Sequence, residues 1–372
     1  MAPTQAALYD EIGGDLELSW TEAELPERER TKHVHRLHPY LGKYVPQLVE
    51  ALLGRYVRPG GRVLDPFAGS GTTLVQALES GYDAVGVDIA AFNALLIRVK
   101  TARYDAFLLE TELRDALSRL GRSRRRAHGY VKEWYAPDAA AELLHFRSLI
   151  EQYESADVLR VVLARAARSA RLTAHFDLEF PRTPQRDPYW CHKHRRTCQP
   201  VQEANKFLAR YLLDTLARLK EFQRVRDRSR DAQVLHGDSR EIELEGRFDG
   251  VVTSPPYPGL IDYHEQHRYA YELLGLDDRR ERELGAAARG TGRAALEAYV
   301  EGISDVLRRC AVALAPGAPV VVVVNDRREL YPVILERSGL RLADRLERHV
   351  NRRTGRRAGE YFESILVSVR ET

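Results

Sequence analysis

Short apolar runs alternate with segments of helical periodicity near both ends of the chain. The runs bounded by polar or turn residues, each of strand length, are 62–65, 84–88, 232–238, 248–252 and 319–325. Apolar residues three and four positions apart predict helices at 44–57, 74–79, 92–100 and 296–314. Two runs at 340–350 and 361–369 predict a closing β-hairpin. Because strands that alternate with helices form parallel sheets, we predict an α/β fold with a mostly parallel sheet, an antiparallel edge and flanking helices.

The middle of the chain has a different pattern. Apolar residues share one helical face in two segments, at Leu143, Phe146, Ile150 and Tyr153 and at Leu208, Leu212, Thr215, Leu219 and Phe222. We therefore predict a largely helical insertion at 101–230, between a first half at 1–100 and a second half at 231–372. Pro181 to Pro200 carries prolines, aromatics and arginines without a period, which predicts a long ordered loop.

Composition and charge restrict the classes of function. The chain has 372 residues, is 44% hydrophobic and carries a formal net charge of +3, so any binding of nucleic acid depends on local patches. The best local candidates for phosphate contacts are Arg122 to Arg126 and Lys193 to Arg196. No apolar run approaches the ~20 residues of a membrane span, and the N-terminus has no signal-peptide core. We expect a cytoplasmic protein.

The three cysteines give no strong metal signature. Cys310 lies in an apolar helical stretch and is expected to pack in the core. Cys191 and Cys198 are separated by six residues, whereas zinc ligands usually pair with two to four residues between them. We therefore expect no metal site and interpret 190–198 as a basic loop, with zinc held by these cysteines and nearby histidines as the weaker alternative.

Two strand ends carry candidate binding residues. The first strand runs into Asp65-Pro66-Phe67-Ala68-Gly69-Ser70-Gly71-Thr72-Thr73, where glycines and a helix N-terminus can approach a ligand. The next strand ends at Asp88, an acid placed to accept from ribose hydroxyls. A dinucleotide oxidoreductase would normally show a third glycine in this turn, and this chain has threonines instead.

The strand at 248–252 leads into Thr253-Ser254-Pro255-Pro256-Tyr257. Neither proline has an N–H to continue a ladder, so the carbonyl oxygens turn outward beside an aromatic ring. A planar group that carries an exocyclic amine fits such a set of acceptors, with the ring of Tyr257 stacked on it.

Together, Asp65 to Thr73, Ser254 to Tyr257 and the segment His38 to Leu48 resemble the S-adenosylmethionine-dependent DNA amino-methyltransferases, which modify the N4 of cytosine or the N6 of adenine. The resemblance implies a Rossmann-like methyltransferase sheet and makes 101–230 the target-recognition region. The motif order resembles the class whose recognition domain lies between the cofactor half and the catalytic half. One departure from the family's order is that the strand carrying Asp238 follows the insertion, where the family would place it before.

The resemblance also implies the site residues. The catalytic ones are Ser254, Pro255, Pro256 and Tyr257. S-adenosyl-L-methionine is the implied cofactor, with contacts from His38, Lys43, Tyr44, Asp65, Phe67, Ala68, Gly69, Ser70, Gly71, Thr72, Asp88, Ile89 and Asp238. Asp262, Tyr263 and His264 are expected either to contact the base or DNA or to cap and pack the helix that begins there.

The implied substrate is double-stranded DNA with a flipped target base. Serine in the first position of the tetrapeptide favours N4-cytosine within the family, and N6-adenine stays the alternative. No cysteine follows a proline, which argues against the covalent C5 reaction.

An RNA or protein amine methyltransferase and a non-catalytic DNA-binding relative are weaker interpretations. A cognate restriction endonuclease in a restriction-modification system, a nucleoid location and a monomeric or homodimeric state stay open.

Overall fold

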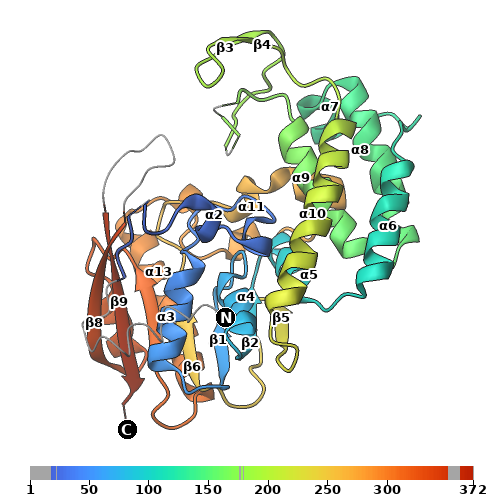
Figure 1. Ribbon diagram of the computed structural model, residues 1–372. Coiled ribbons are helices and arrows are strands. Elements are labelled where there is room, and N and C mark those ends of the chain that lie inside the picture. Colours follow the sequence, from blue (N-terminus) through green and yellow to red (C-terminus); the bar gives the residue numbers. More distant parts are fainter. Residues whose placement is uncertain (1–17, 22, 176, 179, 351–360, 372) are drawn as a thin grey trace. The chain divides into compact units, whose positions relative to one another are not determined.

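The computed structural model describes residues 18–371 except 22, 176, 179 and 351–360 (Figure 1). The chain divides into two compact units. The first comprises Met1–Thr101, Val225–Asp262 and Arg279–Thr372, and the second comprises Ala102–Arg224 and Tyr263–Asp278. Residues 351–357 are where the sequence would next place DNA contacts if the two basic stretches were only solvated surface, and they lie outside the described residues.

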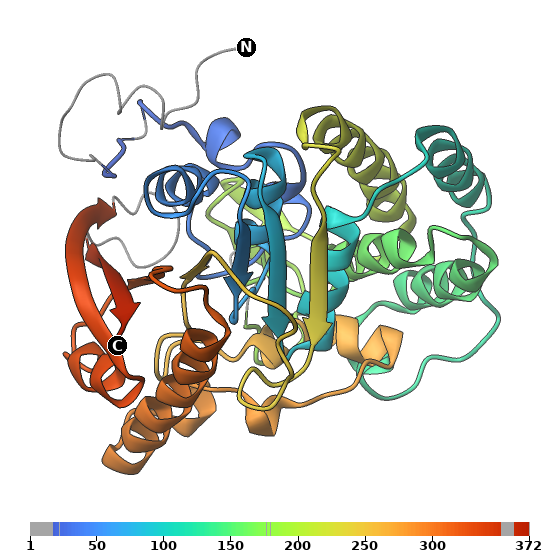
Figure 2. The ribbon, with the colours of Figure 1, turned by 90° about the horizontal axis from the view of Figure 1, so that it is seen from below.

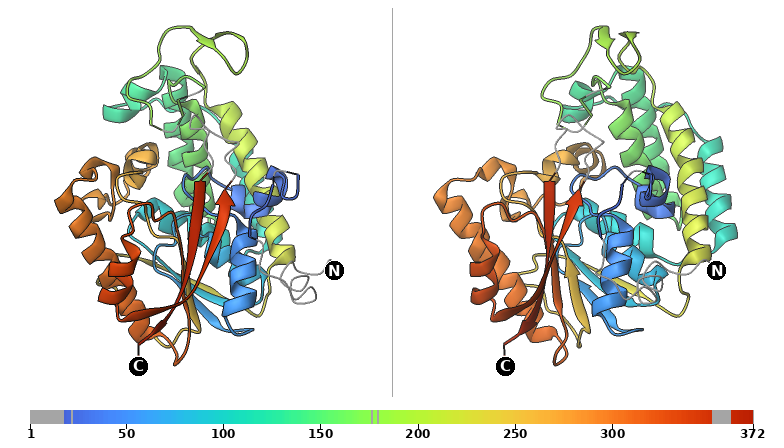
Figure 3. Two further views of the ribbon diagram at one scale, coloured as in Figure 1. Left: turned by 90° about the vertical axis from the view of Figure 1, so that its left-hand side faces the viewer. Right: turned by 60° about the vertical axis from the view of Figure 1, so that its left-hand side comes forward.

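The first unit is built on a seven-stranded sheet in the order β5-β2-β1-β6-β7-β9-β8. Its strands are β1 (Arg62–Asp65), β2 (Asp83–Asp88), β5 (Ala232–His236), β6 (Gly250–Thr253), β7 (Val320–Val324), β8 (Leu340–Val350) and β9 (Tyr361–Arg370). Pairing is parallel from β5 through β7 and antiparallel between β7, β9 and β8. Figure 3 shows β8 and β9 as long neighbouring strands at one edge of the sheet. The predicted α/β fold with an antiparallel edge is confirmed.

Helices cover both faces of this sheet (Figure 2). Successive residues of β7 enter different cores: Val320, Val322 and Val324 belong to one, and Val321 and Val323 belong to the other. All five are buried, because a strand covered on both faces has no solvent side.

The helices of the first unit are α2 (Glu27–Arg30), η1 (His33–Arg36), α3 (Pro46–Tyr56), α4 (Thr72–Glu79), α5 (Ala91–Thr101), η3 (Arg280–Arg282), η4 (Ala287–Arg289), α13 (Arg293–Ala313) and α14 (Tyr331–Arg337). Residues of α13 and α14 pack in one core, whereas residues of α3 and α4 pack in the other. Cys310 on α13 is 1% exposed, as the sequence predicted, and burial raises the pKa of its thiol to about 12.

The second unit is mainly helical. It contains α6 (Ala106–Ser118), α7 (Gly129–Trp134), α8 (Pro137–Leu149), η2 (Ile150–Gln152), α9 (Ala156–Ala170), α10 (Asn205–Val225), α11 (Tyr263–Gln266), α12 (Arg268–Leu274) and two short strands, β3 (Tyr189–Cys191) and β4 (Arg196–Cys198). Helix α12 packs against α7, α8 and α9. An ion pair between the buried Arg165 of α9 and Asp214 of α10, at 2.5 Å, joins those two helices.

Two features of this unit differ from the prediction. The sequence placed all of 231–372 in the second half of the sheet domain, but Tyr263–Asp278 belongs to the helical unit. The long loop predicted between Pro181 and Pro200 was wrong in part, because β3 and β4 form an antiparallel hairpin there. The turn between them contains no glycine, and Arg195 takes the left-handed conformation with φ of 51°, so the usual hairpin signal is missing. None of the described helices combines the length and the apolar character needed to cross a membrane.

Candidate functional site

The glycine turn and the Ser-Pro-Pro-Tyr segment follow neighbouring strands. β1 pairs in parallel with β6 through Val63↔Gly250 and Leu64↔Val251. Parallel neighbours end at the same edge of a sheet, so the two motif loops begin side by side at the carboxyl edge. Ligands bind at this edge in open α/β sheets.

The buried carboxylate of Asp65 ties these two loops together. Its Oδ1 accepts from Thr253 Oγ1 at 2.6 Å and from the Phe67 N–H at 3.1 Å, and its Oδ2 accepts from Thr73 Oγ1 at 2.5 Å. Thr253 immediately precedes the tetrapeptide, and Thr73 lies in the first turn of α4. Burial raises the pKa of Asp65, and the hydrogen bonds from both threonines oppose that rise. One side chain therefore fixes the end of β6, the turn and the helix relative to one another.

The glycine turn is held by the chain's own packing. Gly69 and Gly71 have φ of 52° and 79°, a region that favours glycine. A Cβ on Gly69 would lie 2.9 Å from the Tyr40 hydroxyl, and one on Gly71 would lie 3.0 Å from the Ile97 side chain. The left-handed backbone thus favours glycine at both positions, and a side chain there would also have to displace Tyr40 or Ile97. The sequence had suggested only that these glycines let a ligand approach the backbone.

A buried lysine supports the turn from α5. Lys100 is 1% exposed, and its Nζ donates to the Ser70 carbonyl at 2.5 Å. Burial, together with the nearby charge of Lys43, holds the pKa of Lys100 well below its ordinary value.

Asp88 ends β2 beside this turn. Its carboxylate accepts from the Gly69 and Ala90 N–H groups, both at 2.8 Å, and from Asn93 Nδ2 at 3.2 Å. Burial raises the pKa of Asp88 to about 7 in spite of these hydrogen bonds. A carboxylate offers about four acceptor positions, so three are filled here and one remains for a hydroxyl donor.

Asp238 follows β5, which pairs with β2, and the Gly237 N–H donates to the Asp88 carbonyl at 3.0 Å. The Asp238 carboxylate accepts from Arg240 N, Nε and Nη2 at 3.0, 2.9 and 2.6 Å, and pairs with Arg282 Nη2 at 3.0 Å. Burial acts to raise the pKa of Asp238, but Arg240 and Arg282 hold it below its usual value. The two arginines fill all four acceptor positions.

The Ser-Pro-Pro-Tyr segment is anchored at its end. Tyr299 of α13 donates its hydroxyl to the Pro256 carbonyl at 2.9 Å. Tyr257 donates to Glu363 Oε1 at 3.1 Å, and Glu363 pairs with Arg348 at 2.8 Å across β8 and β9. The ring of Tyr257 is partly buried against the core that contains α13. Ser254 is also partly buried, whereas Pro255 is buried.

The segment His38 to Leu48 reaches the same network. The buried Tyr44 hydroxyl hydrogen-bonds to Thr73 Oγ1, so Tyr44, Thr73 and Asp65 form a chain of contacts. Lys43 Nζ donates to the His35 carbonyl at 2.7 Å. His38 is 1% exposed, and its ring meets Phe92 edge-on at a centroid distance of 4.9 Å.

The other predicted cofactor residues lie around these groups. The Ala68 N–H donates to the Val87 carbonyl at 3.0 Å, and the Ile89 carbonyl lies 3.2 Å from His236 Nε2. Ser70 and Thr72 are buried, with their hydroxyl oxygens 3.5 Å apart. Phe67 is partly buried against the core. Every predicted site residue except His38, Lys43 and Tyr44 thus lies at one edge of the sheet. Asp65 and Asp88 end β1 and β2, Thr72 begins α4, and the others lie in the loops that follow β1, β2, β5 and β6.

Sequence reasoning did not assign roles to Thr253, Tyr299, Glu363, Arg348 and Lys100. Thr253 could have been suspected from its place directly before Ser254. The other four act through partners distant in sequence, so no local pattern marks them.

Two residues that the sequence offered for DNA contacts, His264 and Arg122, are engaged by other parts of the protein. The His264 side chain is fully buried, with its ring centroid 5.1 Å from that of Tyr271, so it packs within the helical unit. Arg122 is engaged by three carboxylates, at 3.1 Å from Glu142, 3.2 Å from Asp138 and 3.3 Å from Glu203. Arg124, Arg125 and Arg126 are exposed.

Comparison with known proteins agrees with this arrangement. Residues 9–97 match a family described as DNA methylase, of the N6/N4 type. The chain is 35% identical to the type II methyltransferase M.MjaII of Methanocaldococcus jannaschii, covering 92% of this chain and 81% of that protein. It is 22% identical to M.BsoBI of Geobacillus stearothermophilus, over 70% of this chain and 56% of that protein.

Solved methyltransferase structures give weaker likenesses. TrmN from Thermus thermophilus has a TM-score of 0.36 at 15% identity, over 89% of this chain and 50% of that one. The strand order, rather than such scores, establishes the fold. Identity of 35% over 92% of this chain and 81% of M.MjaII is decisive for the family. The chain therefore belongs to the DNA amino-methyltransferases, whose methyl donor is S-adenosyl-L-methionine.

Proposed function

We propose that this enzyme methylates the exocyclic N4 of a cytosine flipped out of duplex DNA. The observation that carries the proposal is the Asp65 carboxylate, which binds the start of the Ser-Pro-Pro-Tyr loop and the glycine turn at once. Ser254 supports cytosine as the target base. Within the family, enzymes that methylate adenine more often have Asp or Asn at this position.

The loops after β1, β2 and β5 supply groups that suit the cofactor. Asp88 has an acceptor position for the ribose hydroxyls, and Asp65 and Tyr44 stiffen the turn that would face the methionine end. The carboxylate of Asp238 could accept from the adenine amine of the cofactor only if Arg282 moved away, because the ion pair with Arg282 occupies the acceptor position. When bound, S-adenosyl-L-methionine supplies a methyl carbon made electrophilic by its sulfonium.

The Ser-Pro-Pro-Tyr loop would hold the target base. Tyr257 stacks on the cytosine ring, and its hydrogen bond to Glu363 keeps the ring in place. The Ser254 side chain and the Pro255 carbonyl accept the amine hydrogens and direct the N4 lone pair, while Tyr299 fixes the Pro256 carbonyl. N4 would form the new C–N bond as the bond between the methyl carbon and the sulfonium sulfur breaks, which leaves S-adenosylhomocysteine. The methylated amine would then lose one proton to solvent, with no covalent link to the enzyme. Catalysis then rests on positioning and on fixed dipoles.

The direct test is to incubate the purified enzyme with unmethylated genomic DNA and isotopically labelled cofactor, and to identify the labelled nucleoside by mass spectrometry. Labelled N4-methyldeoxycytidine is expected. Labelled N6-methyldeoxyadenosine alone would overturn the choice of base, and label confined to RNA or protein in parallel reactions would overturn the choice of substrate.

The type II relatives support a role in restriction-modification, in which the methylated site is protected from a cognate endonuclease. The partner endonuclease and the monomeric or homodimeric state stay predictions. The helical unit, with its exposed arginines, is proposed as the target-recognition region.

Cofactor affinity should rise with pH through about 7. Below that pH the Asp88 carboxyl is mostly protonated. The ionised carboxylate accepts more strongly from ribose hydroxyls than the neutral acid does, so binding favours release of the proton. Affinity should increase by up to about tenfold per pH unit below 7 and then level off. Calorimetry from pH 6 to 8 measures this dependence. The amino group of the cofactor also titrates, near pH 8, and it does so whichever protein variant is used. The difference between the pH profiles of wild type and Asp88→Asn therefore gives the contribution of the Asp88 carboxyl. Identical pH profiles for both proteins would contradict the assignment of Asp88.

Duplex binding should depend on the exposed basic groups of the helical unit. Removing one phosphate contact lowers the slope of log affinity against log salt by about 0.9. Neutralising Arg124, Arg125 and Arg126, or Lys193, Arg195 and Arg196, to Gln should weaken binding and flatten this slope without changing cofactor affinity. Arg122→Gln is the control, because that guanidinium is occupied by carboxylates and its substitution should leave the slope unchanged. Equal slopes in all four proteins would show that these stretches are only solvated surface.

A further inference from the structure

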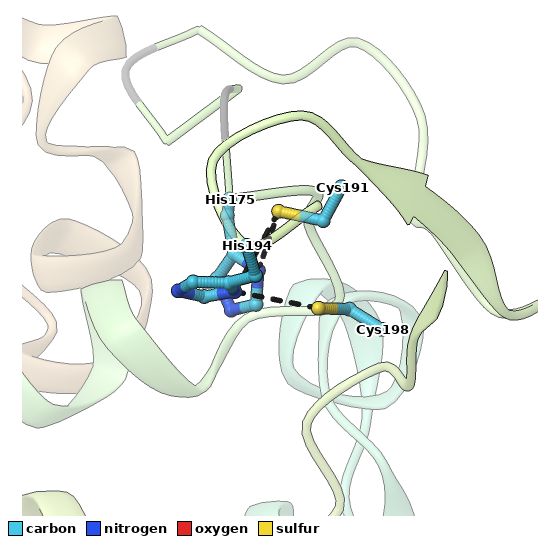
Figure 4. Close-up of side chains that lie close together, drawn as sticks. All are labelled: His175, Cys191, His194 and Cys198. Atoms are coloured by element: carbon cyan, nitrogen blue, oxygen red, sulfur yellow. Dashed lines mark hydrogen bonds between the residues drawn. The ribbon is translucent and has the colours of Figure 1, made fainter. Parts of the chain in front are cut away.

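The β3–β4 hairpin of the helical unit brings four metal-binding side chains to one point. His175, Cys191, His194 and Cys198 each offer a ligand atom, and these atoms all lie within 4.8 Å of one another. Figure 4 shows the two thiols and the two imidazole rings directed toward a common centre. Both cysteines are buried and neither forms a disulfide.

The spacing of these atoms agrees with a tetrahedral zinc site. Zinc binds thiolate at about 2.3 Å and imidazole at about 2.0–2.1 Å, so a sulfur and a nitrogen on one tetrahedron lie about 3.6 Å apart. Cys191 Sγ lies 3.5 Å from His175 Nδ1 and 3.6 Å from His194 Nδ1, and Cys198 Sγ lies 3.4 Å from His194 Nδ1.

Thiol–imidazole hydrogen bonds alone account for this set less well. His194 Nδ1 approaches both sulfurs, but a neutral imidazole nitrogen carries either one proton or one lone pair. It can therefore make one of the two hydrogen bonds well, whereas a cation at the centre satisfies both sulfurs and the nitrogen together.

The Tyr189 hydroxyl competes with a metal ion for the Nδ1 atom of His175. The Tyr189 hydroxyl lies 2.8 Å from His175 Nδ1 and accepts from the His175 backbone N–H at 3.0 Å. With zinc bound, the Nδ1 lone pair would point to the metal and the hydroxyl would keep the hydrogen bond from the His175 backbone N–H. Tyr189→Phe removes this competitor without touching a proposed ligand.

We propose that His175, Cys191, His194 and Cys198 form a structural Cys₂His₂ zinc site. Four protein ligands fill the coordination sphere, which is typical of structural rather than catalytic zinc. Two three-residue strands are marginal by themselves, so a metal that joins them to His175 would supply the stability that a larger sheet would otherwise give. The hairpin so fixed carries the exposed Lys193 and Arg195 in its turn and the exposed Arg196 at the start of β4.

The sequence had suggested no metal because six residues separate the two cysteines. The pairing runs instead through Cys191-x₂-His194, with Cys198 closing the hairpin and His175 contributed from a segment before β3. That expectation is therefore replaced by this proposal.

The other histidine cluster in the described part of the chain is unsuited to a cation. His33, His35 and Glu79 also lie within 4.8 Å of one another. However, Lys32 Nζ is 2.6 Å from Glu79 Oε1 and His33 Nε2 is 3.1 Å from Oε2. The lysine already neutralises the carboxylate and would repel a metal ion.

The test measures zinc in the full-length protein expressed in zinc-supplemented medium, by plasma mass spectrometry after gel filtration. We expect about one zinc per chain in the wild type, in Tyr189→Phe and in His192→Ala. His192 is the matched control because it is an exposed imidazole in the same turn. Cys191→Ser, Cys198→Ser and His194→Ala should each lose most of the metal.

A second readout does not depend on how well the variants fold. Wild-type protein freed of metal under reducing conditions should bind Co²⁺ with the intense visible bands of tetrahedral thiolate coordination, and added Zn²⁺ should abolish them. Wild-type protein that contains no zinc and shows no such bands would overturn the proposal, as would full zinc content in the Cys191→Ser/Cys198→Ser double variant. Intact mass that reveals a Cys191–Cys198 disulfide in freshly purified protein would equally overturn it.

Discussion

Tyr257→Ala is expected to lower single-turnover methyl transfer by at least about 100-fold while cofactor affinity stays within about threefold of wild type. Stacking of a base on an aromatic ring contributes about 1–3 kcal/mol, and a base held about 1 Å out of line can cost a further factor of about 100. The ring lies on the loop after β6, whereas the proposed cofactor contacts lie on other loops, so cofactor binding should survive. Transfer of labelled methyl to genomic DNA measures the rate, and calorimetry measures the affinity.

Tyr257→Phe is the matched control. It keeps the stacking surface and removes only the hydrogen bond to Glu363, whose net value of about 1 kcal/mol corresponds to roughly fivefold. Ser254→Ala should reduce transfer by about 10- to 100-fold, because one acceptor for the amine is removed. Loss of cofactor binding in Tyr257→Ala with unimpaired single-turnover methylation would show that the roles of the two loops are assigned wrongly.

Asp65→Ala should damage both stability and cofactor binding. The substitution leaves the Thr253 hydroxyl, the Thr73 hydroxyl and the Phe67 N–H without their shared acceptor. Each buried polar group left unsatisfied costs about 1–3 kcal/mol. The cost of burying the carboxylate charge, visible in its raised pKa, offsets part of that sum, so we expect a net loss of about 3 kcal/mol in the free energy of unfolding. Urea denaturation measures this loss, and cofactor affinity should fall by more than about tenfold because the turn loses its anchor.

Asp249→Ala provides a control on the same pair of strands. Asp249 accepts from the Arg62 N–H at 2.8 Å at the opposite end of β1 and pairs with Arg58 at the surface. Its replacement should cost about 1 kcal/mol and leave cofactor affinity unchanged. An Asp65→Ala protein with wild-type affinity and wild-type methyl transfer would show that the carboxylate does not organise the site.

Local sequence patterns determined the elements that matter most for the family. The strands at β1, β2, β6 and β7 and the helix α13 were predicted from apolar runs and periodicity, because each has a strong local signal. The glycine turn and the Ser-Pro-Pro-Tyr segment could be placed at one edge of the sheet, since loops after parallel strands meet there. The resemblance that named the methyltransferase family depends on those same local segments.

Only the tertiary structure decided which distant groups complete the site. Thr253 meets Asp65 across 188 positions, and Tyr257 meets Glu363 across 106, so neither contact has a local signature. Likewise, Tyr263–Asp278 joins the helical unit although it follows the catalytic motif directly. His175 reaches Cys191 only because the hairpin folds back on the segment before it. Periodicity specifies what one segment does by itself, whereas these contacts depend on strand order and helix packing, which bring together residues that the sequence keeps apart.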